Sequence, residues 1–423
     1  MREQSATSLE SWQERLEQML PAQSVKQMAA QAQFGERNRK LTPLRFLVSL
    51  VFGWGVEGER SLSSLRRFFI AVTGIGVVSS AFQTRFTKEA VEFLKRVYSF
   101  LLEKVQSAQS GLPMALSRFE DVLAVDGSTI SLRDKLARHF RACRTNHTQA
   151  ALKLHAVVSL RDNAVTELLA KSERYSERRF FSKLFNQFSG SLLLFDLGYF
   201  KHQFFERLHK LGAFFVSRLK DSSNPIIVEV ISGIRNKKAA VGTRLDDNFF
   251  EGPVVEAMVR LGNAGETVFR LVGLRFPGTD TYRFYLTNLL GVEFSASEIA
   301  ELYTRRWQIE LVFKELKSLC RVDQMPTSKP NTVLCLLYAS LIAILVSRLF
   351  AVAAEQTKTT TKRIRRTVVT QCCSHFAREL AAGFVLDAAR LKNAVAHLLA
   401  FILETSPDPN IARAPNRLGV VTH

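Results

Sequence analysis

The sequence predicts a mixed α/β protein in which a sheet-containing core lies between helical regions. Amphipathic stretches of helical period fill residues 1–120, and short alternating or apolar runs typical of strands begin at residue 121. Helical periodicity returns after residue 290. With 423 residues and 47% hydrophobic side chains, the chain can bury a large core.

The N-terminal 120 residues are expected to be helical, with Gly- or Pro-containing joints between the helices. Many of their polar positions are Arg or Lys. This pattern fits a small helical DNA-binding domain, and it fits equally a helical bundle with an ordinary charged surface. The expected helices are Leu9–Ala32, Leu41–Trp54, Ser61–Val72 and Thr87–Gln106.

The central region alternates strands with a helix. The run Asp121–Leu132 alternates like a strand and is expected to turn at Asp126-Gly127. A strand–helix–strand unit further on implies a mixed sheet with a crossover helix. The later elements are strands Ala151–Ser159, Val165–Lys171 and Ser191–Asp196, helix Phe200–Leu211 and strand Ala213–Leu219.

Residues 220–290 are rich in glycine between short β-like runs, which predicts an inserted antiparallel β subdomain. Its expected strands are Ile226–Ile231, Val254–Leu261, Thr267–Leu274 and Tyr282–Thr287. Helices follow to about Leu403, past a basic cluster at Lys358–Arg366, and the Pro-containing tail Thr405–His423 is expected to be mobile. The predicted division is 1–120 (helical, DNA-end-binding), 121–219 (first part of the core), 220–290 (β-rich insertion), 291–355 (second part of the core) and 356–423 (helical C-terminal region and tail).

The formal charge of +19 and the isoelectric point near 10.0 favour a polyanionic partner, either nucleic acid or an anionic membrane. One segment, Val333–Ala354, is long enough to span a bilayer. Arg348 interrupts it, so a buried core helix fits better, and we expect a protein without a membrane partner. The absence of a secretory pattern at the N-terminus and the five cysteines without C-x-x-C spacing favour the cytoplasm, and the absence of a P-loop argues against a nucleotide cofactor.

The most informative segment is Ser295–Lys317, which begins with a capping box and is expected to form one helix. Tyr303, Arg306, Glu310 and Lys317 fall within roughly 60° of one another on one face of that helix. A carboxylate can hold a divalent metal, while Arg, Lys and a phenol can hold phosphate oxygens. The alternative is a solvated basic helix in which Glu310 pairs with Lys314 or Lys317.

Two further carboxylates are expected where strands end. Asp126 lies in VDGS and Asp196 in FDLGYF, each near a glycine that leaves room for a ligand. Each could instead form an ion pair or cap a helix. Together with Glu310 they make the three-carboxylate set that two Mg²⁺ ions need for phosphoryl transfer.

At these positions the chain resembles the DDE transposases of the "insertion sequence four" group. Their hallmark Y-x2-R-x3-E-x6-K is matched by Tyr303, Arg306, Glu310 and Lys317 with every gap correct. VDGSTISL and FDLGYF, followed by FFVSRLK, are similar to the segments around the family's two aspartates. The match spans about residues 121–354.

The resemblance implies an RNase H-like catalytic core with a β insertion between the second Asp and the Glu. Asp126, Asp196 and Glu310 would be the catalytic metal ligands for two Mg²⁺ ions, with Mn²⁺ as a substitute. The implied activity is cut-and-paste transposition: hydrolysis at transposon ends and transfer of the freed 3′-hydroxyl into target DNA, by a homodimer on paired ends. Tyr303, Arg306 and Lys317 would bind phosphates near the cleaved end, and Arg218 and Lys220 would add to the basic DNA-binding surface.

Two other functions remain open: a transposase-derived DNA-binding protein without catalysis, and a nuclease of the same fold. Close relatives form a hairpin with a base stacked on an insertion-domain tryptophan, but the three tryptophans here are Trp12, Trp54 and Trp307. Phe276, Tyr282 or Phe284 would have to substitute.

For the remaining candidates we favour structural roles. For Trp307 we favour packing in the core over stacking on a base. Lys153 and His155 share a strand face and are favoured as structural residues over DNA contacts. Tyr303, Arg306, Glu310 and Lys317 form a polar stripe on the predicted helix. Glu301 and Glu315 lie away from this stripe and are not expected to be ligands.

Overall fold

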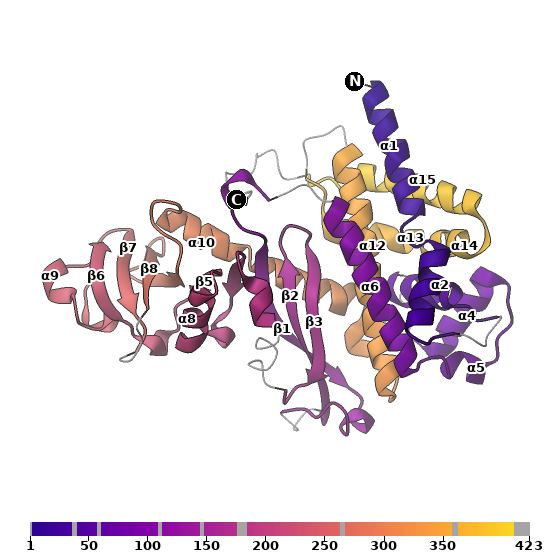
Figure 1. Ribbon diagram of the computed structural model, residues 1–423, viewed down its shortest axis with the longest axis horizontal. Helices are drawn as coiled ribbons and strands as arrows, with labels where there is room; N and C mark the ends of the chain where they lie inside the picture. The colour runs from indigo at the N-terminus through magenta and orange to yellow at the C-terminus, as the bar shows by residue number, and fades with distance from the viewer. Residues whose placement is uncertain are drawn as a thin grey trace.

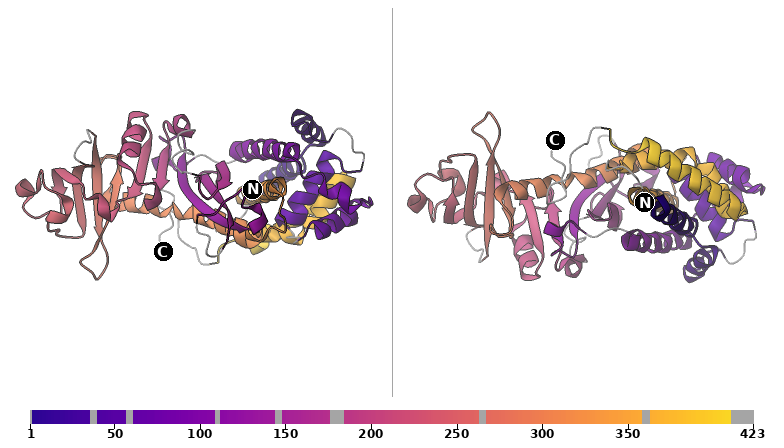
Figure 2. Two further views of the ribbon diagram at one scale, coloured as in Figure 1. Left: turned by 90° about the horizontal axis from the view of Figure 1, so that it is seen from below. Right: turned by 90° about the horizontal axis from the view of Figure 1, so that it is seen from above.

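The computed structural model describes residues 2–35, 40–56, 61–108, 112–143, 148–175, 184–262, 267–357 and 363–409. A nine-stranded sheet runs through the molecule, with helices gathered at one end and antiparallel strands at the other (Figures 1 and 2). The predicted α/β class is confirmed. The part of the basic cluster at 358–362 and the tail from 410 onward lie outside the described residues.

The sheet has the strand order β3-β2-β1-β4-β5-β9-β8-β7-β6. Strands β1, β4 and β5 are parallel, β2 and β3 extend one side antiparallel, and β9 to β6 extend the other side antiparallel. The bounds are β1 Val122–Leu132, β2 Ala150–Ser159, β3 Ala164–Ser172, β4 Leu192–Phe195, β5 Phe214–Arg218, β6 Ile226–Ser232, β7 Val254–Arg260, β8 Val268–Arg275 and β9 Tyr282–Thr287.

The four strands expected between residues 220 and 290 are present, and they continue the main sheet. Strand β9 pairs with β5 through Val216 and Thr287, so the antiparallel part is hydrogen-bonded directly to the parallel core. Short helix α9 (Lys237–Ala240) lies at this end of the molecule (Figure 1). The crossover helix α8 (His202–Lys210) buries Phe205 and Leu208 against one face of the sheet.

The helical end is built around α12 (Pro330–Thr357), which packs along α6 and the π-helical segment Ser49–Val56. This helix is long and apolar enough to cross a membrane by composition, yet 89% of its most apolar window is buried inside the protein. The prediction of a buried core helix is therefore confirmed. The other helices of this end are α1 Arg2–Glu17, α2 Ala22–Gln31, α3 Pro43–Val48, α4 Leu62–Thr73, α5 Ser79–Gln83, α6 Lys88–Ala108, α13 Arg366–His375, α14 Ala377–Leu386 and α15 Ala388–Thr405.

Helices from the two ends of the sequence share one apolar core with one face of β1–β3. Trp12 of α1 is buried in it, and α1 contacts both α12 and α15. Gly55 lies so close to α12 that a Cβ atom there would stand 2.7 Å from the Cβ of Ala343. Helices α1–α6 are thus packed into the same body as the C-terminal helices.

Three expectations about local structure are wrong. Strand β1 does not turn at Asp126-Gly127, because its partner β2 stays paired through these residues and on to Leu132. The stretch Ser295–Lys317 is not one helix: α10 (Ala296–Thr304) and α11 (Trp307–Lys314) are separate, and a π-helical segment (Glu315–Leu319) follows α11. Leu9–Ala32 is also broken, since α2 starts after Pro21, whose ring removes a backbone donor.

Candidate active site

Strands β1 and β4 bring the two aspartates together. Val125 is paired with Phe195, so Asp126 and Asp196 are the next residues on adjacent parallel strands. Neighbouring strands lie about 4.8 Å apart. Asp196 directly follows the last residue of β4, so it lies at a strand end as expected. Asp126 lies in the middle of β1, at the point where the parallel pairing stops.

Helix α11 packs on β1 and β2 and carries Glu310 to the same place. Arg306 connects Glu310 to Asp126: its Nη2 lies 2.5 Å from Glu310 Oε1, and its Nη1 lies 3.5 Å from Asp126 Oδ2. The break between α10 and α11 places Arg306 just before the first turn of α11. Glu310 therefore pairs with Arg306 and not with the lysines of the solvated-helix alternative.

Burial raises the pKa of Asp126, and the negative charges of Asp196 and Glu310 raise it further, while the Gly127 amide and Arg306 oppose the change. The charges of Asp196 and Glu310 are therefore close enough to act on Asp126. In the part of the chain that the structure describes, no three acidic, His or Cys side chains are grouped closely enough to hold an ion as they stand. The donors are all carboxylate oxygens, the type that Mg²⁺ prefers, and Arg306 occupies the position between two of them.

An open cavity of about 390 Å³ lies beside the carboxylates. Asp126 and Glu310 line it together with Lys317, as the stripe predicts. It is also lined by Lys314, one turn after Glu310, and by Ser128 on the same face of β1 as Asp126. These two were not predicted as site residues, although their spacing from Glu310 and Asp126 was a readable signal.

Tyr303 lies close to Arg306 and is buried. It is 9% exposed, its ring lies 5.3 Å from that of Tyr285, and the Arg306 guanidinium lies 5.8 Å from its ring centroid. Burial raises the pKa of Tyr303 to about 12, and Asp196 raises it as well, whereas Arg306 and Arg218 lower it. Its hydroxyl therefore stays protonated at neutral pH and can donate a hydrogen bond.

Arg218 ends β5 near this group, since its charge acts on Tyr303. Its buried Nε has no hydrogen-bond partner among the described residues. Lys220 follows β5 and is exposed. Among the alternatives, His155 is completely buried opposite Gly127 on β2, in line with its favoured structural role.

The expectation that Trp307 packs in the core is wrong. Its side chain is 56% exposed, because α11 turns its apolar face, with Ile309, Val312 and Phe313, toward the sheet and the neighbouring helices. Trp307 therefore lies on the surface directly beside Arg306.

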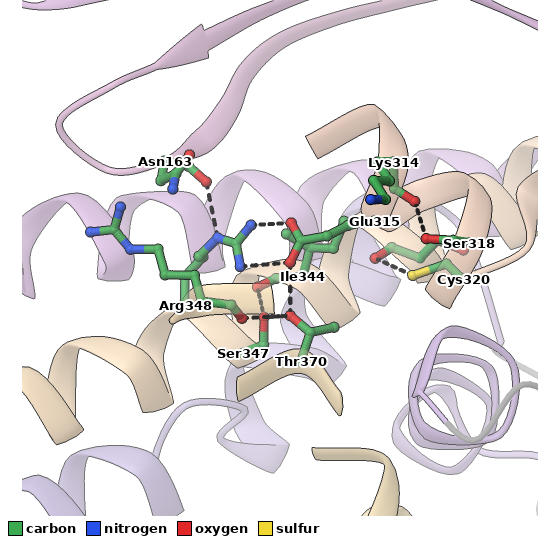
Figure 3. A network of polar contacts seen from close by, with 11 residues as sticks. Asn163, Lys314, Glu315, Ser318, Cys320, Ile344, Ser347, Arg348 and Thr370 are labelled. Atoms are coloured by element: carbon green, nitrogen blue, oxygen red, sulfur yellow. Dashed lines mark hydrogen bonds and ion pairs between the residues drawn. The ribbon is translucent and has the colours of Figure 1, made fainter. Parts of the chain in front are cut away.

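Sequence reasoning also missed a buried polar network behind the site (Figure 3). Glu315 and Arg348 are 3% and 2% exposed and form a two-pronged ion pair. Arg348 Nε donates to the Asn163 carbonyl oxygen at 3.0 Å, and Thr370 Oγ1 donates to Glu315 Oε1 at 3.1 Å. The pair connects the segment after α11 to α12, α13 and the β2–β3 turn.

Residues 117–346 match the transposase DDE domain family. The chain belongs to that family and is a DNA transposase, a metal-dependent enzyme of DNA cleavage and transfer. It is 23% identical to the transposase of insertion sequence element IS1151 from Clostridium perfringens over 367 residues, 76% of each chain. It is 24% identical to that of IS231F from Bacillus thuringiensis subsp. israelensis over 379 residues, 79% of each chain.

A shorter match is 31% identical over 202 residues to the putative transposase y4zB of Sinorhizobium fredii, covering 46% of this chain and 51% of the relative. Among solved structures, the chain is similar to a piggyBac transposase in a synaptic complex with hairpin DNA, with a TM-score of 0.48 and 9% identity. That match covers 93% of this chain and 83% of the other.

Replacing Asp126 by Asn is expected to stabilise the protein at neutral pH. The raised pKa means that ionisation of Asp126 opposes folding: the penalty begins as pH rises past the unfolded value near 3.8 and is complete above the folded pKa. Asn keeps the acceptor for the Gly127 amide and removes the charge. The Tm advantage of Asp126→Asn over wild type should be larger at pH 7 than at pH 4. If the Tm of the variant at pH 7 were equal to or below that of wild type, the raised pKa of Asp126 would be contradicted.

Proposed function

We propose that this chain carries out cut-and-paste transposition of an insertion sequence, as a member of the "insertion sequence four" group. The observation that supports this most is the convergence of Asp126, Asp196 and Glu310, from β1, β4 and α11, beside a cavity lined by lysines. The strand order β3-β2-β1-β4-β5 supports an RNase H-like core, and β6–β9, within residues 220–290, would be the insertion that extends it.

The three carboxylates would hold two Mg²⁺ ions, which supply activation of the attacking oxygen and stabilisation of the leaving oxygen. Mn²⁺ would substitute. Arg306 would leave Asp126 and Glu310 and donate to a phosphate oxygen, since a guanidinium binds phosphate and carboxylate with similar geometry. Lys317 and the protonated Tyr303 would hold neighbouring phosphates, with Arg218 and Lys220 farther along the strand.

The partners are double-stranded DNA at the terminal inverted repeats and at the target, and the working assembly is a homodimer on paired ends. The region 1–120 would bind the end, and 356–423 would serve dimerisation. Because the N-terminal helices share a core with α12–α15, these roles should be tested in the full chain. The place of action would be the bacterial cytoplasm.

The test uses the purified full chain, a supercoiled plasmid carrying the inverted repeats that flank the gene, and Mg²⁺. We expect cleavage at the repeats followed by joining of the 3′-ends to a second plasmid. Cleavage without joining would indicate a nuclease of the same fold, and retarded DNA without cleavage would indicate a non-catalytic relative. Absence of end-specific binding and cleavage with both Mg²⁺ and Mn²⁺ would overturn the proposal.

Trp307 is expected to stack on a base next to the cleaved phosphate, since it is exposed beside Arg306. The aromatic residues of the insertion already contact one another or a cation: Tyr282 stacks with Phe284 and meets Phe250 edge-on, and Arg283 covers Phe276. Base stacking contributes about 1–3 kcal/mol, so Trp307→Ala should weaken end binding by about 5- to 150-fold. Trp307→Phe should retain most of the affinity. Anisotropy of a labelled end measures both, and equal affinity of the Ala variant and wild type would rule out this role.

A further inference from the structure

Glu315 and Glu310 lie on opposite sides of the same helical segment. Glu310, Lys314 and Lys317 line the active-site cavity. Glu315 lines a different cavity, together with Gln308 and Leu311 of α11. Glu315 therefore does not line the active-site cavity, and any influence it has on the reaction has to pass through the helix.

Glu315 is fixed by partners from two other elements. Both of its oxygens accept hydrogen bonds from Arg348 of α12, and Oε1 also accepts from Thr370 of α13. Thr370 is fixed in turn by Ser347, 2.9 Å away (Figure 3). These directional bonds define the rotation of the segment about its axis more tightly than apolar contacts do.

The same pair connects the helix to the sheet that carries Asp126. Arg348 Nε donates to the carbonyl of Asn163, which adopts a left-handed φ of 51° in the turn between β2 and β3. Strand β2 is paired with β1, and Ala156 lies opposite Asp126. Through Arg348, the segment that follows Glu310 is thus held to the sheet beneath Asp126.

The backbone at this point needs such an anchor. Glu315 begins a π-helical segment, in which the Cys320 amide donates to the Glu315 carbonyl, five residues back. A π turn is a local departure from the α-helical register, and a change of register by one residue rotates the following side chains by about 100°. Lys317 lies two residues beyond Glu315, so a shift would take it out of the cavity.

Stability alone does not account for a buried ion pair, because apolar replacements of similar volume are often as stable. We propose that Glu315 and Arg348 are positioning residues that set the rotation of α11, and with it the placement of Glu310 and Lys317 against Asp126. This assignment rests on the proposed function for its catalytic consequence, but its effect on the carboxylate site can be measured without DNA.

The test compares wild type with the double variant Glu315→Leu/Arg348→Met, which removes both charges and leaves none unpaired. The control is Glu256→Leu/Arg270→Met: Arg270 is 3% exposed and binds Glu256 at 2.8 Å in β7 and β8. Mn²⁺ affinity is measured by the electron paramagnetic resonance signal of free Mn²⁺, with Asp126→Asn as the blank for the carboxylate site. End cleavage at saturating Mn²⁺ is measured in parallel.

We expect the Mn²⁺ affinity of the folded double variant to be about 10- to 100-fold lower than that of wild type, the range for residues that orient metal ligands. Its rate of end cleavage should fall by a similar factor, about 10- to 100-fold. The control pair should behave like wild type, and the affinity of the double variant for a labelled DNA end should fall by no more than the loss of the single Lys317 contact. Unchanged Mn²⁺ affinity and cleavage, or an equal loss in the control pair, would overturn the proposal.

Arg348→Lys provides a second measurement should the apolar pair not fold. Lysine keeps the charge opposite Glu315 and loses the bond to Asn163 and the two-pronged geometry. We expect the same direction of change, and wild-type behaviour would again overturn the proposal. If wild type binds Mn²⁺ but cleaves no DNA, the proposed function fails while the Mn²⁺ titrations still decide the positioning role.

Discussion

Glu310→Gln is expected to reduce end cleavage by at least about three orders of magnitude, since ligands of a catalytic metal act as a unit with it. Glutamine keeps the length of the side chain and can still accept a hydrogen bond from Arg306, but it carries no charge for a cation. The measurement is the single-turnover rate on a labelled transposon end with Mg²⁺. Binding of the same end should remain close to wild type.

Glu301→Gln is the matched control. Glu301 lies on α10, the helix that precedes α11, away from the polar stripe, and it does not line the cavity of Glu310. Its cleavage rate should stay within a fewfold of wild type. A Glu310→Gln variant that cleaves at a rate comparable to the control would show that the metal is held elsewhere.

Arg348→Met alone is expected to lower the free energy of unfolding by about 3–5 kcal/mol, because it leaves the carboxylate of Glu315 buried without its partner. Adding Glu315→Leu should recover most of this loss, since the double variant leaves no unpaired charge at this position. Urea unfolding followed by circular dichroism measures both. A single variant that loses less than about 1 kcal/mol would mean that Glu315 takes up a proton or reaches water.

The polar stripe was readable from sequence because helical spacing survives a local break. Tyr303 and Glu310 lie on separate helices, yet Arg306 still reaches both of them. The break itself was not predicted, since neither Gly nor Pro marks residues 304–307. Arg306 at this break is held by Asp126 and Glu310, so we attribute the local backbone to tertiary contacts.

Other errors came from contacts between elements that are distant in sequence. Asp126-Gly127 has the composition of a turn, but pairing with β2 keeps it extended. The exposure of Trp307 depends on which face of α11 meets the sheet. The ion pair of Glu315 and Arg348 joins residues 33 positions apart on different helices, and no periodic pattern connects them.

The shared core of the two chain ends has a consequence for synthesis of the protein. Helices α1–α6 emerge first from the ribosome, but the surface that covers them belongs to α12–α15, more than 200 residues later. The apolar faces of the early helices therefore remain exposed to solvent until the last part of the chain has been synthesised. A gene copy truncated near its 3′ end would therefore yield an N-terminal region without the C-terminal helices that cover it. This region could not complete its packing even if the rest of the coding sequence were intact.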